Sequence, residues 1–267
     1  MDLKKIALFS DLDGTLFDDS CQVSLRNQRA IQDFVQRGGL FCVSTGRTPE
    51  NAWPFISRIA VNGPGIFLNG AAVYDYKTKS FLQTYTLNDH ILRPFLERLM
   101  DQFPWLNIQV YNQGNICFIT PKDQAEEWFI REHQPCCFFR LDQVEVPWLK
   151  ILIQGKPEQL AEAEGMIKEA AAGNSEVVYS NPQYLEILPQ NVSKGRTLKV
   201  LAEDPLLSGR RLAAVGDYYN DLQLLENADI SGAPANAPKD IQEKADVVLC
   251  SNNDGAVADF IQYLDQL

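Results

Sequence analysis

The chain has 267 residues, enough for one large domain or two moderate ones with a buried core. Hydrophobic residues make up 45% and charged residues 22%, the usual balance of a soluble protein. The net charge of −11 and the pI of about 4.7 argue against duplex nucleic acid or an anionic membrane as a partner, and the sequence identifies no protein partner.

Membrane segments, disulfides and histidine chemistry are poorly supported. No apolar run is long enough to cross a bilayer, and the first residues lack the apolar stretch of a signal peptide, so we expect a cytoplasmic protein. The six cysteines form no CxxC pair and no zinc spacing, which indicates free thiols. The two histidines, His90 and His133, have helix-like polar surroundings and are interpreted as surface residues.

The first eighty residues alternate strands and helices. The apolar run Ile6–Phe9 predicts a short buried strand, and Ser24 can cap a helix that ends at a Gly-Gly pair. Residues 40–43 predict a second buried strand, joined to the first by a right-handed crossover. A further strand and a hairpin follow, with a turn at residues 77–79.

The pattern changes near residue 84 to helices mixed with strands whose neighbours are antiparallel. Predicted there are a helix over 88–103, strands in "NIQVYN" and "NICFIT", a helix around "AEEWFIREH", a strand in "WLKILIQ", a helix in "EQLAEAEGMIKEAA", and strands in "EVVYS" and "YLEIL". After residue 190 the alternation returns, in "KGRTLKVLAED", "RLAAVG", "NDLQLLENA" and "DVVLC". We therefore predict an α/β protein with a doubly wound, Rossmann-like parallel-sheet core (1–83 and 188–267) and an inserted α+β cap domain (84–187).

Polar side chains follow three of the predicted parallel strands: Asp11 and Asp13 after the first, Ser44 and Thr45 after the second, and Asp217, Asn220 and Asp221 after the strand at 212–215. The carboxyl ends of parallel strands meet at one edge of a sheet, where such folds bind ligands. Carboxylates held close together repel one another, so a counterion is needed. Mg²⁺ suits an all-oxygen site that keeps some waters, and the sequence therefore predicts a magnesium site.

A metal, a hydroxyl, backbone amides and Lys194, which opens a predicted helix, together suit a bound phosphoryl group. Carboxylates can form aspartyl-phosphate intermediates. In an extended segment Asp11 and Asp13 project to the same side, so one can attack phosphorus while the other gives a proton to the leaving oxygen. These residues predict phosphoryl-transfer chemistry.

Four ordered motifs carry a family resemblance: "DLDGT" at 11–15, "STGR" at 44–47, "SKG" at 193–195 and "GDYYND" at 216–221. They resemble the motifs of the haloacid dehalogenase-like phosphatases. The large insertion between the second and third motifs, together with "YLEILPQNVSKG" and "NNDGAVADFI", is similar to the Cof-type sugar-phosphatase branch. One departure is "ISGAPANAP", which we expect to be a loop beside the site and where the family more often has a Met-Gly-Asn-Ala run.

The resemblance implies a role for each matching position. Asp11 would be the nucleophile and a metal ligand, and Asp13 the general acid/base that also binds the metal through its backbone carbonyl. The remaining positions would be Thr45, Gly46 and Asn220 on the phosphoryl group, Lys194 between nucleophile and phosphate, Asp217 on Mg²⁺, Asp221 supporting the metal through water, and Arg47 facing the substrate or the cap.

Each residue also has a simpler explanation, because Asp11, Thr45 and Asp221 can cap helices and a single lysine is usually a surface residue. The four motifs together favour a Mg²⁺-dependent phosphohydrolase that acts on a small phosphorylated metabolite, with sugar phosphates the leading class. Two alternatives stay open: a phosphosugar mutase of the same fold and a non-catalytic phosphate-binding or signalling module. The second does not explain Asp13, which binding alone does not require.

Overall fold

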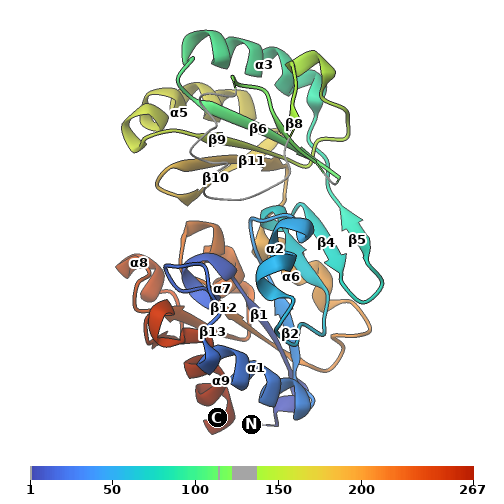
Figure 1. Ribbon diagram of the computed structural model, residues 1–267, viewed down its shortest axis with the longest axis vertical. Coiled ribbons are helices and arrows are strands. Elements are labelled where there is room, and N and C mark those ends of the chain that lie inside the picture. Colours follow the sequence, from blue (N-terminus) through green and yellow to red (C-terminus); the bar gives the residue numbers. More distant parts are fainter. Residues whose placement is uncertain (1, 114, 122–136) are drawn as a thin grey trace. The chain divides into compact units, whose positions relative to one another are not determined.

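The computed structural model describes residues 2–113, 115–121 and 137–267. The chain divides into two compact units, coloured along the sequence in Figure 1. We call them the core unit (Met1–Gln83 with Ser193–Leu267) and the inserted unit (Thr84–Val192). The second boundary follows Val192, five residues later than predicted, because strand β11 (Tyr184–Pro189) continues past residue 187 in the sheet of the inserted unit.

A parallel sheet forms the centre of the core unit. Among the described residues its strand order is β14-β13-β12-β1-β2, and every neighbouring pair is parallel. The strands are β1 (Ile6–Ser10), β2 (Leu40–Val43), β12 (Arg211–Val215), β13 (Ile230–Pro234) and β14 (Val247–Leu249). The chain reverses its direction of travel across the sheet at β1, as in other doubly wound folds, so the predicted α/β class is confirmed.

Strand β13 corrects one expectation, because the "ISGAP" stretch is not a loop. It is a buried strand between β12 and β14. Ser, Gly, Ala and Pro have weak strand propensity, which hid it from the sequence pattern. Tight packing explains the small residues, since a Cβ on Gly232 would lie 2.9 Å from side-chain atoms of both Leu249 and Phe260.

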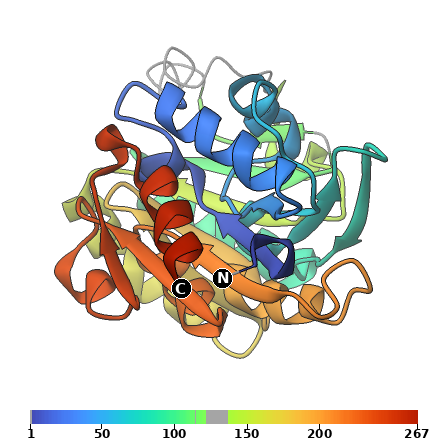
Figure 2. The ribbon, with the colours of Figure 1, turned by 90° about the horizontal axis from the view of Figure 1, so that it is seen from below.

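Helices cover both faces of the core sheet. On one face, α6 (Lys194–Ala202) and α7 (Leu222–Asn227) pack apolar side chains against β1, β2 and β12. On the other, α1 (Leu25–Gln36) and α9 (Ala256–Gln266) lie side by side, as Figure 2 shows from below. The side chain of Ser24 caps α1 by accepting a hydrogen bond from the Asn27 N–H, as predicted.

The core unit also contains short peripheral elements. Strands β3 (Gly65–Phe67), β4 (Ala72–Asp75) and β5 (Ser80–Thr84) form a small separate sheet, and β4 and β5 meet at the predicted turn. Helix α2 (Pro49–Ile56) follows β2, and its N-terminus is capped by the Thr48 side chain. Helix α8 (Lys239–Gln242) follows β13. Asn51 of α2 contacts Arg47, which follows β2.

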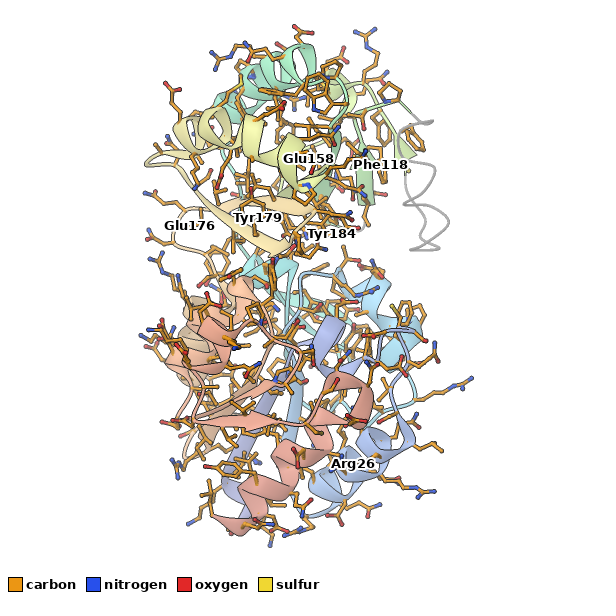
Figure 3. The ribbon with its side chains drawn as sticks, turned by 90° about the vertical axis from the view of Figure 1, so that its left-hand side faces the viewer. Arg26, Phe118, Glu158, Glu176, Tyr179 and Tyr184 are labelled. Atoms are coloured by element: carbon orange, nitrogen blue, oxygen red, sulfur yellow. The ribbon has the colours of Figure 1, made fainter. Side chains whose placement is uncertain are left out.

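The inserted unit is a mixed sheet covered by helices. In the described residues its strand order is β10-β11-β9-β6-β7-β8. The elements are α3 (Asp89–Gln102), β6 (Asn107–Asn112), β7 (Asn115–Phe118), β8 (Cys137–Phe138), β9 (Lys150–Gln154), α5 (Pro157–Ala171), β10 (Ser175–Asn181) and β11. Apolar side chains of α3 and α5 pack against one face of this sheet, and Tyr179 of β10 packs at the edge of that core (Figure 3).

The opposite face of this sheet carries a buried ion pair. Lys150 Nζ lies 3.1 Å from Glu186 Oε2, and both side chains are only 2% exposed. The Ser180 hydroxyl donates to Glu186 Oε1 at 2.6 Å, and the Tyr111 ring lies 4.5 Å from Lys150 Nζ. A buried cation and a buried carboxylate are therefore paired here, next to a hydroxyl and an aromatic ring.

Some predictions concern residues outside the described ranges, namely the helix around "AEEWFIREH", His133 and Cys136. His90 is exposed on α3, as predicted. The other five cysteines are free thiols. Across the described ranges, every helix is too short or too polar to traverse a lipid bilayer.

Candidate active site

The first carboxylate of the site lies where β1 ends. The Asp11 N–H donates to the Val215 carbonyl oxygen at 2.9 Å, which fixes the residue beside β12. The chain then makes one helical turn, Leu12–Leu16, that is interrupted at Asp13 and Gly14. Gly14 has a φ of +76°, and a Cβ there would collide with the Asp217 carboxylate. Only glycine therefore allows this turn to approach the second acidic cluster.

Lys194, the first residue of α6, lies between two carboxylates. Its Nζ is 2.5 Å from Asp11 Oδ1 and 2.6 Å from Asp221 Oδ1. The lysine side chain is fully buried, so this cation is not a surface residue. Helix α6 can approach this closely because a Cβ on Gly195 would collide with the backbone of α7 at Gln223. Lys194 and Asp11 are 183 positions apart in the sequence. The "SKG" and "DLDGT" motifs therefore meet in space.

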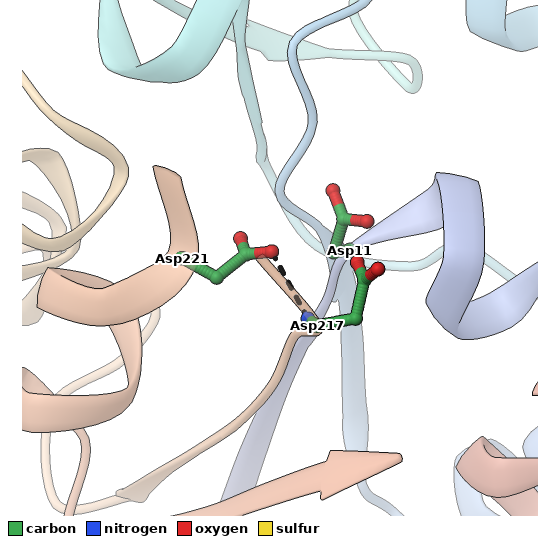
Figure 4. Close-up of side chains that lie close together, drawn as sticks. All are labelled: Asp11, Asp217 and Asp221. Carbon is green, nitrogen blue, oxygen red and sulfur yellow. Dashed lines mark hydrogen bonds between the residues drawn. The ribbon is translucent and has the colours of Figure 1, made fainter. Parts of the chain in front are cut away.

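Three carboxylates converge at this point (Figure 4). Asp11, Asp217 and Asp221 each offer one oxygen, and these oxygens lie within 4.8 Å of one another. Asp221 Oδ2 accepts a hydrogen bond from the Asp217 N–H at 3.2 Å, and Thr15 donates to Asp217 Oδ1 at 3.2 Å. An all-oxygen set at this spacing suits a hard divalent cation such as Mg²⁺.

The charges of this cluster do not balance. Burial and repulsion from the neighbouring carboxylates raise the pKa of Asp11 well above its usual range, although Lys194 opposes the shift. Burial and the Asp221 carboxylate raise the pKa of Asp217 to about 7. Burial disfavours the charged form of Lys194, but Asp11 and Asp221 outweigh this and raise its pKa. One cation thus faces three acids, and a bound divalent cation would supply the missing charge.

The second strand brings a hydroxyl to the same edge of the sheet. Thr45 is buried, and its hydroxyl oxygen accepts from the Arg47 N–H at 3.1 Å. The Thr45 carbonyl oxygen accepts from the Asn69 N–H at 3.1 Å. A Cβ on Gly46 would lie 3.0 Å from Asn69 Nδ2, so the glycine leaves little room between its backbone and that amide.

Asn69 is a site residue that the sequence reasoning did not identify. Its side-chain oxygen accepts from Asn220 Nδ2 at 3.0 Å, so it joins the loop after β3 to the loop after β12. The other polar atom of Asn220, Oδ1, is buried and has no hydrogen-bond partner in the described structure. The Asn69-Gly70 pair after a buried strand, in left-handed backbone conformation, was the available signal.

The Arg47 side chain is bonded to Asp13 and not to the three carboxylates of the acidic cluster. Its Nε donates to Asp13 Oδ2 at 2.7 Å and its Nη2 to Asp13 Oδ1 at 2.6 Å. Of the predicted site residues, the structure therefore gathers Asp11, Lys194, Asp217 and Asp221 around one point. Thr45, Gly46 and Asn220 are linked through Asn69, and Asp13 is paired with Arg47.

Comparison with known proteins gives the class of this fold and site. The model of the haloacid dehalogenase-like hydrolase family matches residues 8–261, so the chain belongs to this family. A solved structure of a HAD subclass IIB sugar phosphatase, BT4131, shares the fold with a TM-score of 0.82 at 16% identity, over 98% of this chain and 99% of that one.

Two curated relatives from Bacillus subtilis cover almost the whole chain. Phosphatase YwpJ is 26% identical and covers 98% of this chain and 100% of its own length. The 5-amino-6-(5-phospho-D-ribitylamino)uracil phosphatase YwtE is 27% identical over 98% of both chains. The predicted Cof-type branch is confirmed, and the comparisons support the predicted class of enzyme, a phosphatase.

Proposed function

We propose that this protein is a Mg²⁺-dependent phosphohydrolase that releases inorganic phosphate from a small phosphorylated metabolite through an aspartyl-phosphate intermediate on Asp11. The observation that carries the proposal is the position of Asp11, 2.5 Å from the buried Lys194 and within 4.8 Å of two further carboxylates. A binding module would not need a second carboxyl at Asp13.

The metal would be held by side chains of Asp11 and Asp217, with Asp221 in support and the Asp13 carbonyl as a further ligand. When bound, it would polarise the phosphoryl oxygens and neutralise charge that builds up during transfer. Lys194 would lower the electrostatic repulsion between the Asp11 carboxylate and the anionic phosphoryl group. The phosphoryl oxygens would be bound by the Thr45 hydroxyl, the Gly46 backbone amide and the Asn220 side-chain amide.

The reaction has two displacements at phosphorus. An Asp11 carboxylate oxygen attacks phosphorus, the bond from phosphorus to the ester oxygen breaks, and Asp13 gives its proton to the leaving alcohol. A water molecule then attacks the acyl phosphate and gives a proton back to Asp13. The phosphorus–Asp11 bond breaks, which releases phosphate and restores both carboxyl groups to their starting states.

The substrate class is inferred from the relatives and from the domain organisation. One relative is named for a phosphoribityl compound, and the fold is shared with a sugar phosphatase. We assign recognition of the non-phosphate part of the substrate to the inserted unit, which the family resemblance identifies as the cap. Sugar phosphates and related phosphorylated small molecules are therefore the leading class.

The test is phosphate release from p-nitrophenyl phosphate with and without Mg²⁺, followed by a screen of phosphorylated sugars. Asp11→Asn should abolish turnover, whereas Asp101→Asn, at an exposed position on α3, should not change it. Acid quenching during turnover should trap one phosphoryl group on the wild type and none on Asp11→Asn. Equal phosphate release by wild type and Asp11→Asn would overturn the proposal, and faster isomerisation than hydrolysis of a sugar bisphosphate would favour a mutase.

A further inference from the structure

The pair formed by Asp13 and Arg47 gives the acid a fixed geometry. Two parallel hydrogen bonds, of 2.7 and 2.6 Å, join Nε and Nη2 of the guanidinium to the two carboxylate oxygens. This arrangement restrains both the position and the plane of a carboxyl group. The Asp13 side chain is 51% exposed, and in the described part of the chain its carboxylate has no other side-chain partner. Without Arg47 it would rotate in water.

The arginine is itself held rigidly. Its side chain is only 10% exposed, and its third nitrogen, Nη1, donates to Asn51 Oδ1 at 2.8 Å. The guanidinium carbon lies 4.8 Å from the centre of the Phe55 ring, a cation–π contact. Asn51 and Phe55 both belong to α2, and the Asn51 N–H is bonded to the Thr48 cap. Helix α2 therefore fixes the guanidinium, and the guanidinium fixes Asp13.

The same contacts argue against a phosphate-binding role for Arg47. Each of its three nitrogens already donates to a protein oxygen, two on Asp13 and one on Asn51. Binding an anion with these N–H groups would break the paired bonds to Asp13 or the bond to Asn51. Its contacts are those of a residue that acts through another side chain.

Resting on the proposed function above, we propose that Arg47, supported by Asn51 and Phe55, is a positioning residue that aligns the Asp13 carboxyl group for proton transfer to the leaving oxygen. When Asp13 carries the proton, one of the two bonds to Arg47 opens: the carbonyl oxygen keeps its bond and the hydroxyl turns to the leaving oxygen. General acid catalysis requires heavy-atom distances of hydrogen-bond length at the transition state, so orientation of the acid is part of its effect. Asp13 is the catalytic residue, and the Arg47 guanidinium acts on the reaction through its paired hydrogen bonds to Asp13.

The role predicts a dependence on the leaving group. A sugar or alkyl alkoxide needs a proton when the ester bond breaks, whereas p-nitrophenolate can leave without one. The parameter kcat/KM reports the steps up to the first irreversible one, here formation of the aspartyl phosphate. Loss of alignment should therefore lower kcat/KM for an alkyl phosphate strongly and for p-nitrophenyl phosphate weakly. Loss of a phosphate-binding residue would lower both equally.

The experiment compares wild type, Arg47→Met, Arg47→Lys and Asn51→Ala on glycerol 3-phosphate, a sugar phosphate and p-nitrophenyl phosphate. We expect Arg47→Met to lose about 100-fold in kcat/KM on the alkyl esters, within the range of general acid effects, and about 3-fold or less on the aryl ester. Arg47→Lys, which keeps the charge without the paired bonds, should show the same selectivity at smaller size. Asn51→Ala tests the same idea with Arg47 and Asp13 intact.

Arg58→Met, at an exposed position just after α2, is the matched control and should leave both values unchanged. Circular dichroism and Mg²⁺ titration will show whether each variant is folded and still binds the metal. Equal losses on alkyl and aryl esters by folded Arg47 and Asn51 variants would overturn the positioning role. Absence of hydrolysis of every ester by the wild type would instead overturn the proposed function, and the inference with it.

Discussion

Each unit of the molecule contains a buried lysine, and the two differ in what surrounds it. In the inserted unit, Lys150 is paired with the Glu186 carboxylate. In the core unit, Lys194 contacts Asp11 and Asp221, with Asp217 close by, so three acids lie around one cation. A buried pair of opposite charges does not call for a further ion. A cluster of three buried acids around one cation is electrostatically costly, and a bound divalent cation would relieve that cost.

Replacing each buried lysine tests this difference, and we expect the largest effect on turnover. Lys194→Met should lower kcat for p-nitrophenyl phosphate by about 1,000-fold, because one donor to a developing oxyanion is worth about 100- to 1,000-fold and the lysine also offsets the nucleophile's charge. The double variant Lys150→Met/Glu186→Leu should leave this activity within about 3-fold of wild type. Steady-state kinetics checks both, and comparable losses in the two would contradict the distinction.

At the Lys150–Glu186 pair we expect the effect on stability rather than on turnover, and we expect the single variant to be less stable than the double variant. Glu186→Leu alone should lower the free energy of unfolding by about 3–5 kcal/mol, because it leaves Lys150 buried without its carboxylate. Adding Lys150→Met should recover most of that loss, since two apolar side chains can replace a buried pair. Urea denaturation measures the changes. A double variant as unstable as Glu186→Leu would contradict the prediction that two apolar side chains can replace the buried pair.

The unbalanced cluster should make the metal-free protein less stable as pH rises. Asp217 keeps its proton up to about pH 7 in the folded state, whereas its usual pKa is 3.8, so the folded state binds more protons between these values. The free energy of unfolding must then fall as pH rises through this window. In EDTA, the Tm of wild type should fall by about 2–4 °C more than that of Asp217→Asn between pH 5 and pH 8.

The smallest effect concerns the metal itself. Mg²⁺ binds the deprotonated acids, so 5 mM Mg²⁺ (about tenfold above an expected sub-millimolar Kd) should raise the Tm by about 2–4 °C at pH 8 and less at pH 5.5. The Asp217→Asn variant should show little rise at either pH. Differential scanning fluorimetry measures this, and an equal Mg²⁺ effect in Asp217→Asn would remove Asp217 from the ligand set.

Patterns in the sequence were enough for the parts of the fold that depend on apolar runs and strand ends. Strands β1, β2 and β12 are continuous apolar segments followed by polar residues, so both the parallel sheet and the meeting of Asp11 with Asp217 could be predicted. Strand β13 could not, because its small residues are selected by the packing of Phe260 and Leu249 rather than by strand propensity.

The site was predictable in its backbone positions but not in its side-chain partners. Spacing along a strand places Asp13 and Arg47 at the same edge, yet it cannot say that the arginine turns toward the acid and not toward a phosphate. That choice depends on Asn51 and Phe55, which lie on the next helix and appear in no motif. Asn69 was missed for the same reason, since its partner Asn220 is 151 positions away.

The order in which the strands are synthesised has a consequence for how the protein is made. β1 leaves the ribosome early, but its neighbour β12 ends at Val215. Until then, one edge of β1 lacks its native partner, and Asp11 lacks its companion acids, Asp217 and Asp221. An unpaired apolar edge invites aggregation. Any translation product that stops short of Asp221 would therefore be an inactive chain with an exposed strand, and we expect it to depend on chaperones or to be degraded.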